Sequence, residues 1–374
     1  MEQVRYSEFS LKLHNAGVAA RIPLNGSIEV TRRCPLRCVH CYNNLPAQDR
    51  RARSAELTYD EHCRILDELA DAGCLWLLYT GGEIFLRNDF LRMYTYAKKK
   101  GMLVTLFTNG VLVTQSIADY LAEYSPFIIE ITLYGSTRET YERVTGVAGS
   151  YERCLRGIEL LRNRNLPLRL KTVVLTINKH ELEGTKAMAR NLGLEFRYDA
   201  MINPRLDQCL APLSVRLPPE EAVRIDLGDE KVRAEWQKYT TRFKGPVHAP
   251  ERWDDLFHCG AGMSSFSIDP YGNLQPCGFL TGDMWSLRRG SFQEGWEGPV
   301  RQTRSKKITR RTKCTSCEIK ALCGMCPALG KLENGDAEEP VEYLCRAAHQ
   351  RTRALGTEVP SHGDCAYCEA GGMA

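Results

Sequence analysis

Short apolar runs alternate with amphipathic stretches from about residue 27 to residue 200. Six runs have the length and the β-branched composition of buried strands. Between them, apolar residues recur at helical spacing, and several of these stretches end at Gly or Asn, as helices often do. The predicted strands are 27–31, 75–80, 103–108, 127–133, 168–176 and 194–201, and the predicted helices are 57–73, 88–101, 114–124, 150–165 and 180–192.

This alternation predicts an α/β fold in which a parallel sheet is connected by helical crossovers. The strands are nearly continuous apolar runs, as expected when helices cover both faces of a sheet. The pattern alone fits either an open doubly wound sheet or a partial (β/α)6 barrel. In both folds, the functional residues lie at the carboxyl ends of the strands.

The alternation stops after residue 201. Residues 202–257 are rich in proline and of mixed polarity, and the chain that follows is rich in Cys, Gly and turn residues, with a hairpin turn predicted at 269–273. The predicted domains are an N-terminal extension (1–26), the α/β domain (27–201), a connecting segment (202–257), a cysteine-rich domain (258–350) and a C-terminal tail with a CxxC motif (351–374).

Composition excludes several classes of function. The 374 residues are 43% hydrophobic and 26% charged, and the net charge of +4 is too small to indicate nucleic-acid binding. No apolar run approaches the roughly 18 residues of a membrane helix, and the first residues lack the apolar core of a signal peptide. The sequence therefore predicts a cytoplasmic protein.

The 16 cysteines are unusual for such a chain. In a reducing compartment, clustered thiols more often bind metal than form disulfides. Four of them are isolated, and these are interpreted as small buried apolar residues: Cys63, Cys74, Cys154 and Cys209.

Three cysteines follow the first predicted strand as Cys34, Cys38 and Cys41. Thiolates suit iron–sulfur clusters or zinc, but structural zinc takes four ligands, whereas a cubane held by three cysteines leaves one iron open. This CxxxCxxC loop resembles that of the radical S-adenosylmethionine (SAM) superfamily. The resemblance implies a TIM-like partial barrel and a [4Fe–4S] cluster whose open iron binds SAM, which is cleaved reductively to a 5′-deoxyadenosyl radical.

Further motifs stand where that family has its SAM contacts. Gly81-Gly82-Glu83 resembles the GGE element that meets the methionine amino group, and Thr108-Asn109-Gly110 resembles the family's TNG turn. The resemblance assigns SAM binding to Gly81, Gly82, Glu83, Asn109, Thr132, Arg153 and Lys171.

The second group of cysteines resembles the SPASM extension of radical SAM enzymes, which binds auxiliary [4Fe–4S] clusters. The alternative from spacing alone is a zinc ribbon, because paired CxxC motifs also bind zinc. The resemblance implies three clusters in all. It assigns Cys259, Cys277 and Cys326 to auxiliary cluster I, and Cys314, Cys317, Cys323 and Cys345 to auxiliary cluster II.

The set for auxiliary cluster I is one cysteine short of four. Three hypotheses follow. The fourth iron of this cluster is open to a substrate or small ligand, or Cys365 or Cys368 binds that iron. The third is that the final CxxC motif is a mobile tail with free thiols. Gly278 follows Cys277, where sulfatase-maturing relatives often have an Asp that accepts a proton, so no general base is assigned.

The resemblance implies a peptide-modifying enzyme that oxidises or crosslinks a ribosomally made precursor peptide, similar to the pyrroloquinoline quinone peptide cyclases. Because about 26 residues precede the first strand, we expect a separate small leader-binding protein, together with an electron donor such as flavodoxin or ferredoxin. The alternatives are a small-molecule enzyme, such as a haem-biosynthesis decarboxylase, and a metal-binding scaffold without enzymatic activity.

The stretch 301–313 is strongly cationic, and three interpretations are open. It is a solvated surface, or a docking site for an acidic partner or substrate, or a source of positive potential that stabilises the thiolates nearby.

Overall fold

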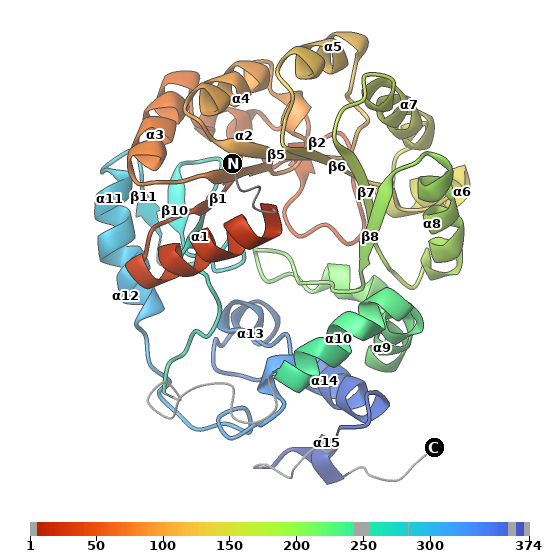
Figure 1. Ribbon diagram of the computed structural model, residues 1–374, viewed down its shortest axis with the longest axis vertical. Coiled ribbons are helices and arrows are strands. Elements are labelled where there is room, and N and C mark those ends of the chain that lie inside the picture. Colours follow the sequence, from red (N-terminus) through yellow and green to blue (C-terminus); the bar gives the residue numbers. More distant parts are fainter. Residues whose placement is uncertain (1–5, 243–253, 283, 358–363, 370–374) are drawn as a thin grey trace. The chain divides into compact units, whose positions relative to one another are not determined.

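A computed structural model describes residues 6–242, 254–282, 284–357 and 364–369. These residues form two compact units (Figure 1). The first unit comprises residues 1–199 and 259–304, and the second comprises residues 200–258 and 305–374. The domain ranges predicted from the sequence have other bounds, and they stay a prediction.

The six predicted strands are present and lie side by side in one sheet. Each pairs in parallel with its neighbour, so the sheet has the parallel order that crossover helices produce. The predicted α/β fold is therefore confirmed. The strands are β1 (Asn25–Glu29), β4 (Trp76–Thr80), β5 (Leu103–Thr108), β6 (Ile128–Thr132), β7 (Leu168–Val173) and β8 (Glu195–Asp199).

The sheet continues beyond β1 with three strands from the distant segment 259–304. Strand β9 pairs in parallel with β1, with Asn25 opposite Ser265, and β10 and β11 follow in antiparallel order. The predicted hairpin turn joins β9 to β10, and the Asp269 carboxylate accepts hydrogen bonds there from the backbone N–H groups of Tyr271 and Asn273. These strands are β9 (Ser265–Ile268), β10 (Asn273–Gln275) and β11 (Trp285–Ser286).

Helices surround the arc of strands (Figure 1), and their apolar sides pack on the sheet. Thr58 and Glu61 form a capping box at the start of α3, and Thr114 and Thr137 cap α5 and α6. The helices of this unit are α1 (Tyr6–Ala20), α2 (Arg50–Ala55), α3 (Tyr59–Asp71), α4 (Phe90–Lys99), α5 (Gln115–Glu123), α6 (Arg138–Thr145), α7 (Ser150–Arg162), α8 (Leu182–Asn191), α11 (Phe292–Gly295) and α12 (Arg301–Arg304).

The second unit is helical. Ion pairs between its two chain segments join Arg216 to Glu333 and Arg351 to Asp226. Its helices are α9 (Pro219–Gly228), α10 (Glu230–Arg242), α13 (Pro327–Asn334), α14 (Glu342–Ala354) and α15 (Ala366–Glu369).

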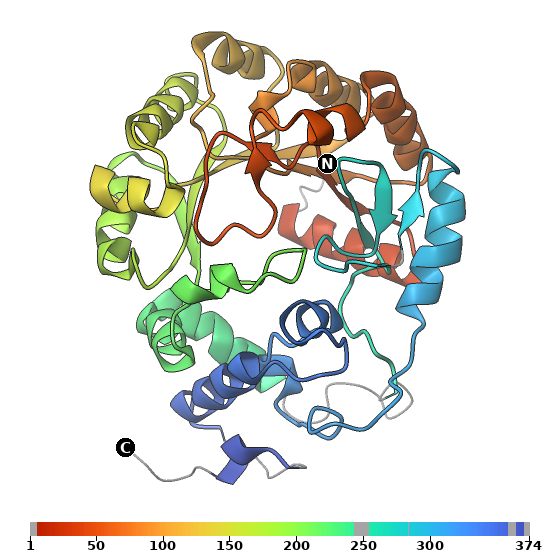
Figure 2. The same cartoon turned by 180° about the vertical axis from the view of Figure 1, so that it is seen from behind.

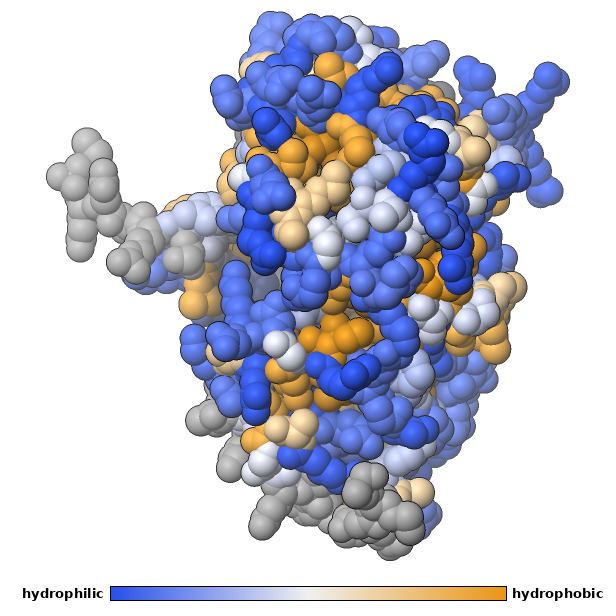
Figure 3. All heavy atoms as spheres, turned by 90° about the vertical axis from the view of Figure 1, so that its right-hand side faces the viewer, coloured by the Kyte–Doolittle hydropathy of each residue, from blue (hydrophilic) through white to orange (hydrophobic). Residues whose placement is uncertain are grey.

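Hydrophilic side chains cover most of the face drawn in Figure 3, with apolar residues scattered among them. No helix in the described ranges has both the length and the apolarity that a membrane crossing requires.

Candidate active site and cysteine clusters

The loop with the first three cysteines leaves the carboxyl end of β1 and returns through a short parallel pair, β2 (Arg33–Cys34) and β3 (Leu45–Pro46). Figure 2 shows this loop in red-orange, inside the arc of strands. Cys34 is buried, Cys38 and Cys41 are half-buried, and all three are free thiols. Burial raises the pKa of the Cys34 thiol to about 12.

Helix α6, which the sequence analysis did not predict, holds this loop in place. The backbone N–H groups of Arg37 and Val39 donate to the carbonyls of Thr145 and Val144, at 2.8 and 3.0 Å. These carbonyls belong to the last turn of α6, where helical partners are missing. The carboxyl end of α6 therefore shapes the loop between the first two cysteines.

The Gly-Gly-Glu motif begins directly after β4 and lies against the start of the cysteine loop. Gly82 and Glu83 donate backbone hydrogen bonds to the carbonyls of Thr31 and Arg33, at 2.6 and 3.0 Å. A Cβ atom on Gly81 would lie 2.2 Å from the Thr31 oxygen, and one on Gly82 would lie 2.2 Å from the Arg33 oxygen. The two glycines are therefore required by the close approach of these two backbones.

The Glu83 side chain is fully buried and joins the GGE and TNG motifs. Its carboxylate accepts hydrogen bonds from the Thr108 hydroxyl at 2.7 Å and the Asn109 backbone N–H at 2.9 Å. Burial raises the pKa of this carboxyl to about 6 even though the hydrogen bonds favour its ionised form. The Asn109 amide in turn lies 3.4 Å from the Cys34 sulfur. The structure thus brings together Cys34, Glu83 and Asn109, three of the residues assigned to the cluster and to SAM.

The other three predicted SAM contacts have different surroundings. Thr132 is the last residue of β6, and its register partner Lys171 lies within β7. The Lys171 ammonium lies 3.3 Å from the Glu130 carboxylate, and burial lowers its pKa to about 8. Arg153 is exposed on α7 and donates to the Gly149 carbonyl of its own helix start. All seven assignments to SAM stay predictions.

The residues of the cysteine loop fit an iron–sulfur cluster. Three thiols on one loop form a soft donor set that leaves room for a further ligand. His40, next to Cys41 in the loop, is half-buried, its buried Nδ1 atom has no hydrogen-bond partner, and burial lowers its pKa to about 4. A neutral imidazole there can donate its N–H to a sulfur or to a bound ligand.

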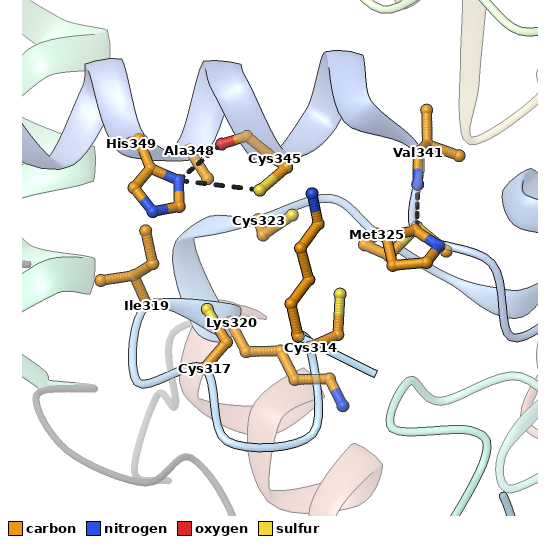
Figure 4. A pocket seen from close by; sticks show the side chains of 12 residues that line it. Cys314, Cys317, Ile319, Lys320, Cys323, Met325, Val341, Cys345, Ala348 and His349 are labelled. Carbon is orange, nitrogen blue, oxygen red and sulfur yellow. Dashed lines mark hydrogen bonds between the residues drawn. The ribbon is translucent and has the colours of Figure 1, made fainter. Parts of the chain in front are cut away.

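Four cysteines of the second unit line one pocket: Cys314, Cys317, Cys323 and Cys345. Figure 4 shows Cys345 and His349 on α14 facing the loop that carries the other three. Burial raises the pKa values of Cys317 and Cys323 to about 12 and about 11. Such thiols are neutral without metal, and a metal cation would favour their thiolate forms.

The three cysteines assigned to auxiliary cluster I are divided between the units. Cys259 is exposed and Cys277 half-buried in the first unit, whereas Cys326 is the N-cap of α13 in the second. The Cys365 sulfur lies 3.7 Å from that of Cys345, a residue of the other predicted set. The role of the final CxxC in auxiliary cluster I stays a hypothesis, and residues 370–374 lie outside the described residues.

Residues 28–189 match the family model of the Radical SAM superfamily. This segment is a radical SAM domain. The chain is accordingly an enzyme, and the family implies a [4Fe–4S] cluster and SAM as its cofactors.

Relatives of known function match nearly the whole chain. The AdoMet-dependent heme synthase of Methanosarcina barkeri is 28% identical over 339 residues, covering 84% of this chain and 94% of the relative. The PqqA peptide cyclase of Granulibacter bethesdensis is 27% identical over 365 residues, covering 93% and 95%. The crystal structure of Streptococcus suis SuiB bound to S-adenosylmethionine has a TM-score of 0.66 at 14% identity, covering 92% of this chain and 82% of SuiB, and so shares the fold.

The radical SAM domain also contains a buried carboxylate that the sequence analysis missed. Glu29 ends β1, and its carboxylate accepts a hydrogen bond from the Asn43 amide at 2.6 Å. Arg32 lies 3.3 Å away, yet burial raises the pKa of Glu29. Glu29 could have been recognised in the sequence, because it is a charged residue within a predicted strand that lies directly before the cysteine loop.

In the part of the cationic stretch that belongs to the second unit, three cations pair with carboxylates of that unit. Lys307 lies 2.5 Å from Asp255, Arg310 pairs with Asp336 and Glu339 at 2.7 and 2.9 Å, and Lys313 pairs with Glu342. Internal neutralisation of this kind favours the interpretation as a solvated surface over a dock for an acidic partner.

Substituting Glu181 with Gln should destabilise the radical SAM domain. The Glu181 carboxylate accepts hydrogen bonds from the backbone N–H groups of Ser136 and Thr137 at 2.7 and 3.0 Å, at the start of α6. Burial raises the pKa of Glu181, but these bonds and those from the hydroxyls of Thr137 and Thr140 outweigh it and bring the pKa to about 2. We expect a loss of about 2 kcal/mol in unfolding free energy at pH 7, after allowance for solvent screening.

The pH dependence of unfolding tests this interpretation. Because the pKa is depressed, the stabilisation is complete above the ordinary value of 4.5 and is lost as the pH falls toward 2. The difference between wild type and Glu181→Gln should therefore shrink below pH 4.5. Glu183→Gln is the matched control, since that side chain is 76% exposed. Equal losses in the two variants would contradict the role given to Glu181.

Proposed function

We propose that this enzyme holds its [4Fe–4S] cluster on Cys34, Cys38 and Cys41 and modifies a ribosomally made peptide. The observation that carries the proposal is the convergence of Cys34, Glu83 and Asn109 at the carboxyl ends of three neighbouring strands. When bound, the cluster and SAM supply a 5′-deoxyadenosyl radical that abstracts hydrogen from the substrate.

The chain's own residues would position SAM. The buried Glu83 carboxylate, with a pKa of about 6, is mostly ionised at pH 7 and can accept a hydrogen bond from the methionine ammonium. Gly81 and Gly82 bring their backbone directly against the start of the cysteine loop, so the amino-acid end of SAM would lie beside this contact. Thr132 and Lys171, which lie side by side, are proposed to contact its ribose and carboxylate.

The choice of a peptide substrate rests on the match to the PqqA peptide cyclase, which extends over 95% of that enzyme. The name of this relative, peptide cyclase, describes a modification of the same kind as the proposed oxidation or crosslink. Cys259, Cys277 and Cys326 are proposed to hold an auxiliary cluster. The separate leader-binding protein and the electron donor stay predictions.

The second candidate is a porphyrin-modifying enzyme, favoured by the match to the AdoMet-dependent heme synthase over 94% of its length. The sequence analysis offered the cationic stretch as a contact for the carboxylates of such a substrate. Because Lys307, Arg310 and Lys313 are paired with the chain's own carboxylates, these three cations do not support such a contact.

A substrate assay distinguishes the two candidates. The reconstituted enzyme is incubated with SAM, reductant and either the precursor peptide encoded beside its gene or an iron porphyrin that carries propionate side chains. We expect the peptide, and not the porphyrin, to raise 5′-deoxyadenosine formation and to lose hydrogen, as measured by mass spectrometry. Loss of carbon dioxide from the porphyrin with an unchanged peptide would contradict the peptide proposal.

A further inference from the structure

A polar cavity lined by arginines lies beside the cysteine loop in the first unit. Its volume is about 690 Å³, and its walls come from Arg33, from residues within 47–58, which include α2, and from residues 86–89. Helix α2, red-orange in Figure 2, follows the cysteine loop directly along the chain. Four guanidinium groups and two carboxylates line the cavity, which leaves a net charge of +2: Arg33, Arg50, Arg53, Arg87, Glu56 and Asp89.

The inner wall of the cavity is a network of paired charges. The Glu56 carboxylate accepts hydrogen bonds from Nε and Nη2 of Arg33, at 2.8 and 3.0 Å. Arg87 donates to the Asp89 carboxylate at 2.8 Å and to the Leu57 carbonyl at 2.9 Å. The side chains of Arg33, Arg87 and Glu56 are buried, and each has its hydrogen-bond partners. This network shapes the wall, and its charges balance one another.

The excess positive charge belongs to Arg50 and Arg53, which are exposed on α2. The ion pairs of the cavity are made by its other two arginines, and in the described ranges neither Arg50 nor Arg53 forms one. The nearby Asp49 carboxylate caps α2 by accepting a hydrogen bond from the Ala52 backbone N–H at 2.8 Å. Helix α2 thus differs from the stretch 301–313, because it presents cations that no carboxylate of the chain neutralises.

The cavity and the candidate active site lie on opposite faces of β2. Arg33 and Cys34 are consecutive residues of this strand, so their side chains point to opposite sides. The Arg33 side chain lines the cavity and donates to the Ala47 carbonyl at 3.1 Å. The Cys34 sulfur lies 3.4 Å from the Asn109 amide, on the side of the SAM motifs. The backbone of β2 therefore separates the cavity from the first thiol of the cysteine loop.

We propose that this cavity is the docking surface of an acidic one-electron carrier protein, whose carboxylates contact Arg50 and Arg53. The inference rests on the proposed function, because each reductive cleavage of SAM consumes one electron. The carrier is oxidised by one electron and the cluster is reduced by one. That electron is consumed when the C–S bond of SAM breaks to give methionine and the 5′-deoxyadenosyl radical. Complementary charge suits such a partner, since it speeds brief encounters and fixes their orientation.

A comparison of two reductants tests the docking surface. The reconstituted full-length enzyme and its Arg50→Glu/Arg53→Glu variant are mixed, without SAM, with reduced flavodoxin, and cluster reduction is followed by stopped-flow absorbance. We expect the variant to be reduced at least about tenfold more slowly at low salt, because electrostatic steering changes association rates by about 10- to 1,000-fold. The difference should nearly vanish at about 1 M salt, where charges are screened within about 3 Å.

Two further measurements separate docking from catalysis. Isothermal titration calorimetry should show weaker binding of oxidised flavodoxin to the variant, which is a readout independent of turnover. Dithionite is a small reductant that needs no docking surface, so both proteins should form 5′-deoxyadenosine at the same rate with it. If the wild type forms none with dithionite, the proposed function fails, whereas the reduction measured without SAM still tests the docking surface.

Arg162→Glu/Arg190→Glu is the matched control, with the same change of charge. Both residues are exposed, and they lie in the last turns of α7 and α8. Crossover helices return the chain to the amino ends of the parallel strands, so this rim is opposite the cysteine loop. The control should be reduced by flavodoxin at nearly the wild-type rate. Equal rates for the two double variants would overturn the proposal. So would a loss of precursor-peptide binding in Arg50→Glu/Arg53→Glu with unchanged reduction by flavodoxin.

Discussion

Replacement of Cys34, Cys38 and Cys41 together by alanine is expected to abolish the formation of 5′-deoxyadenosine from SAM. The loop that carries these thiols is formed by β2 and β3 and by the end of α6, and none of these contacts depends on the thiols themselves. The fold should therefore persist while the donor set is lost. We expect the rate to fall at least about a thousandfold, equivalent to about 4 kcal/mol in the activation barrier.

Iron analysis gives this experiment a second readout. The triple variant should contain about four irons fewer than the wild type, the content of one [4Fe–4S] cluster. Cys63→Ala is the control, because this half-buried cysteine lies on α3 and belongs to none of the cysteine groups. Deoxyadenosine formed at the wild-type rate by the triple variant would refute the assignment of the cluster to this loop.

Substitution of Gly82 with alanine is expected to damage both the fold and the site. The added Cβ would lie 2.2 Å from the Arg33 carbonyl oxygen and 2.7 Å from its carbon, and both are backbone atoms. Because neither backbone can rotate away as a side chain would, β4 and the cysteine loop must separate. We expect a loss of about 3 kcal/mol in unfolding free energy, at the upper end of the effects of overpacking.

Chemical denaturation of the apoprotein measures this loss, and iron content after reconstitution measures its effect on the site. Gly298→Ala is the matched control, since a Cβ there has no atom within 4 Å. The control should unfold within about 0.5 kcal/mol of the wild type. A Gly82→Ala variant as stable as the control would show that the backbones of Gly82 and Arg33 do not need to be this close.

The strands of the radical SAM domain were predictable because their pattern is strong. Strand β5 has the bounds that the sequence predicted, and β4 and β6 differ by one residue at the ends. Apolar, β-branched runs such as those of β4 and β5, in which every second residue is buried, leave little choice of structure. Glu83 and Asn109, which follow β4 and β5, were assigned to SAM from the resemblance of the GGE and TNG motifs, and this assignment stays a prediction.

Helix α6 was missed because its sequence lacks an apolar stripe. RETYERVT is mostly polar, and the helix is stabilised by Thr137 at its start and by Gly146, whose φ of 66° ends it. Helix α1, at residues 6–20, was missed because its apolar and polar residues are weakly segregated. In both cases, tertiary contacts decide what the local pattern leaves open.

The proximity of Cys365 to Cys345 could not be predicted either. The two residues are 20 positions apart, and no sequence periodicity relates a helix to a tail that packs on it. Similarly, the pairing of the cationic stretch required carboxylates from distant segments, such as Asp255. The spacing of residues along the sequence shows which side chains neighbouring positions bring together. It does not show which side chains from distant segments lie close to one another.

The pairing of β9 with β1 has a consequence for the synthesis of the protein. Ser27 and Ser267, whose hydroxyls are 3.0 Å apart across these strands, are separated by 240 residues. At roughly 5–20 residues per second, the ribosome needs roughly 12–50 seconds to add the segment that completes this edge. During that time β1 is an unpaired edge of the sheet, directly before the loop that carries the three cysteines.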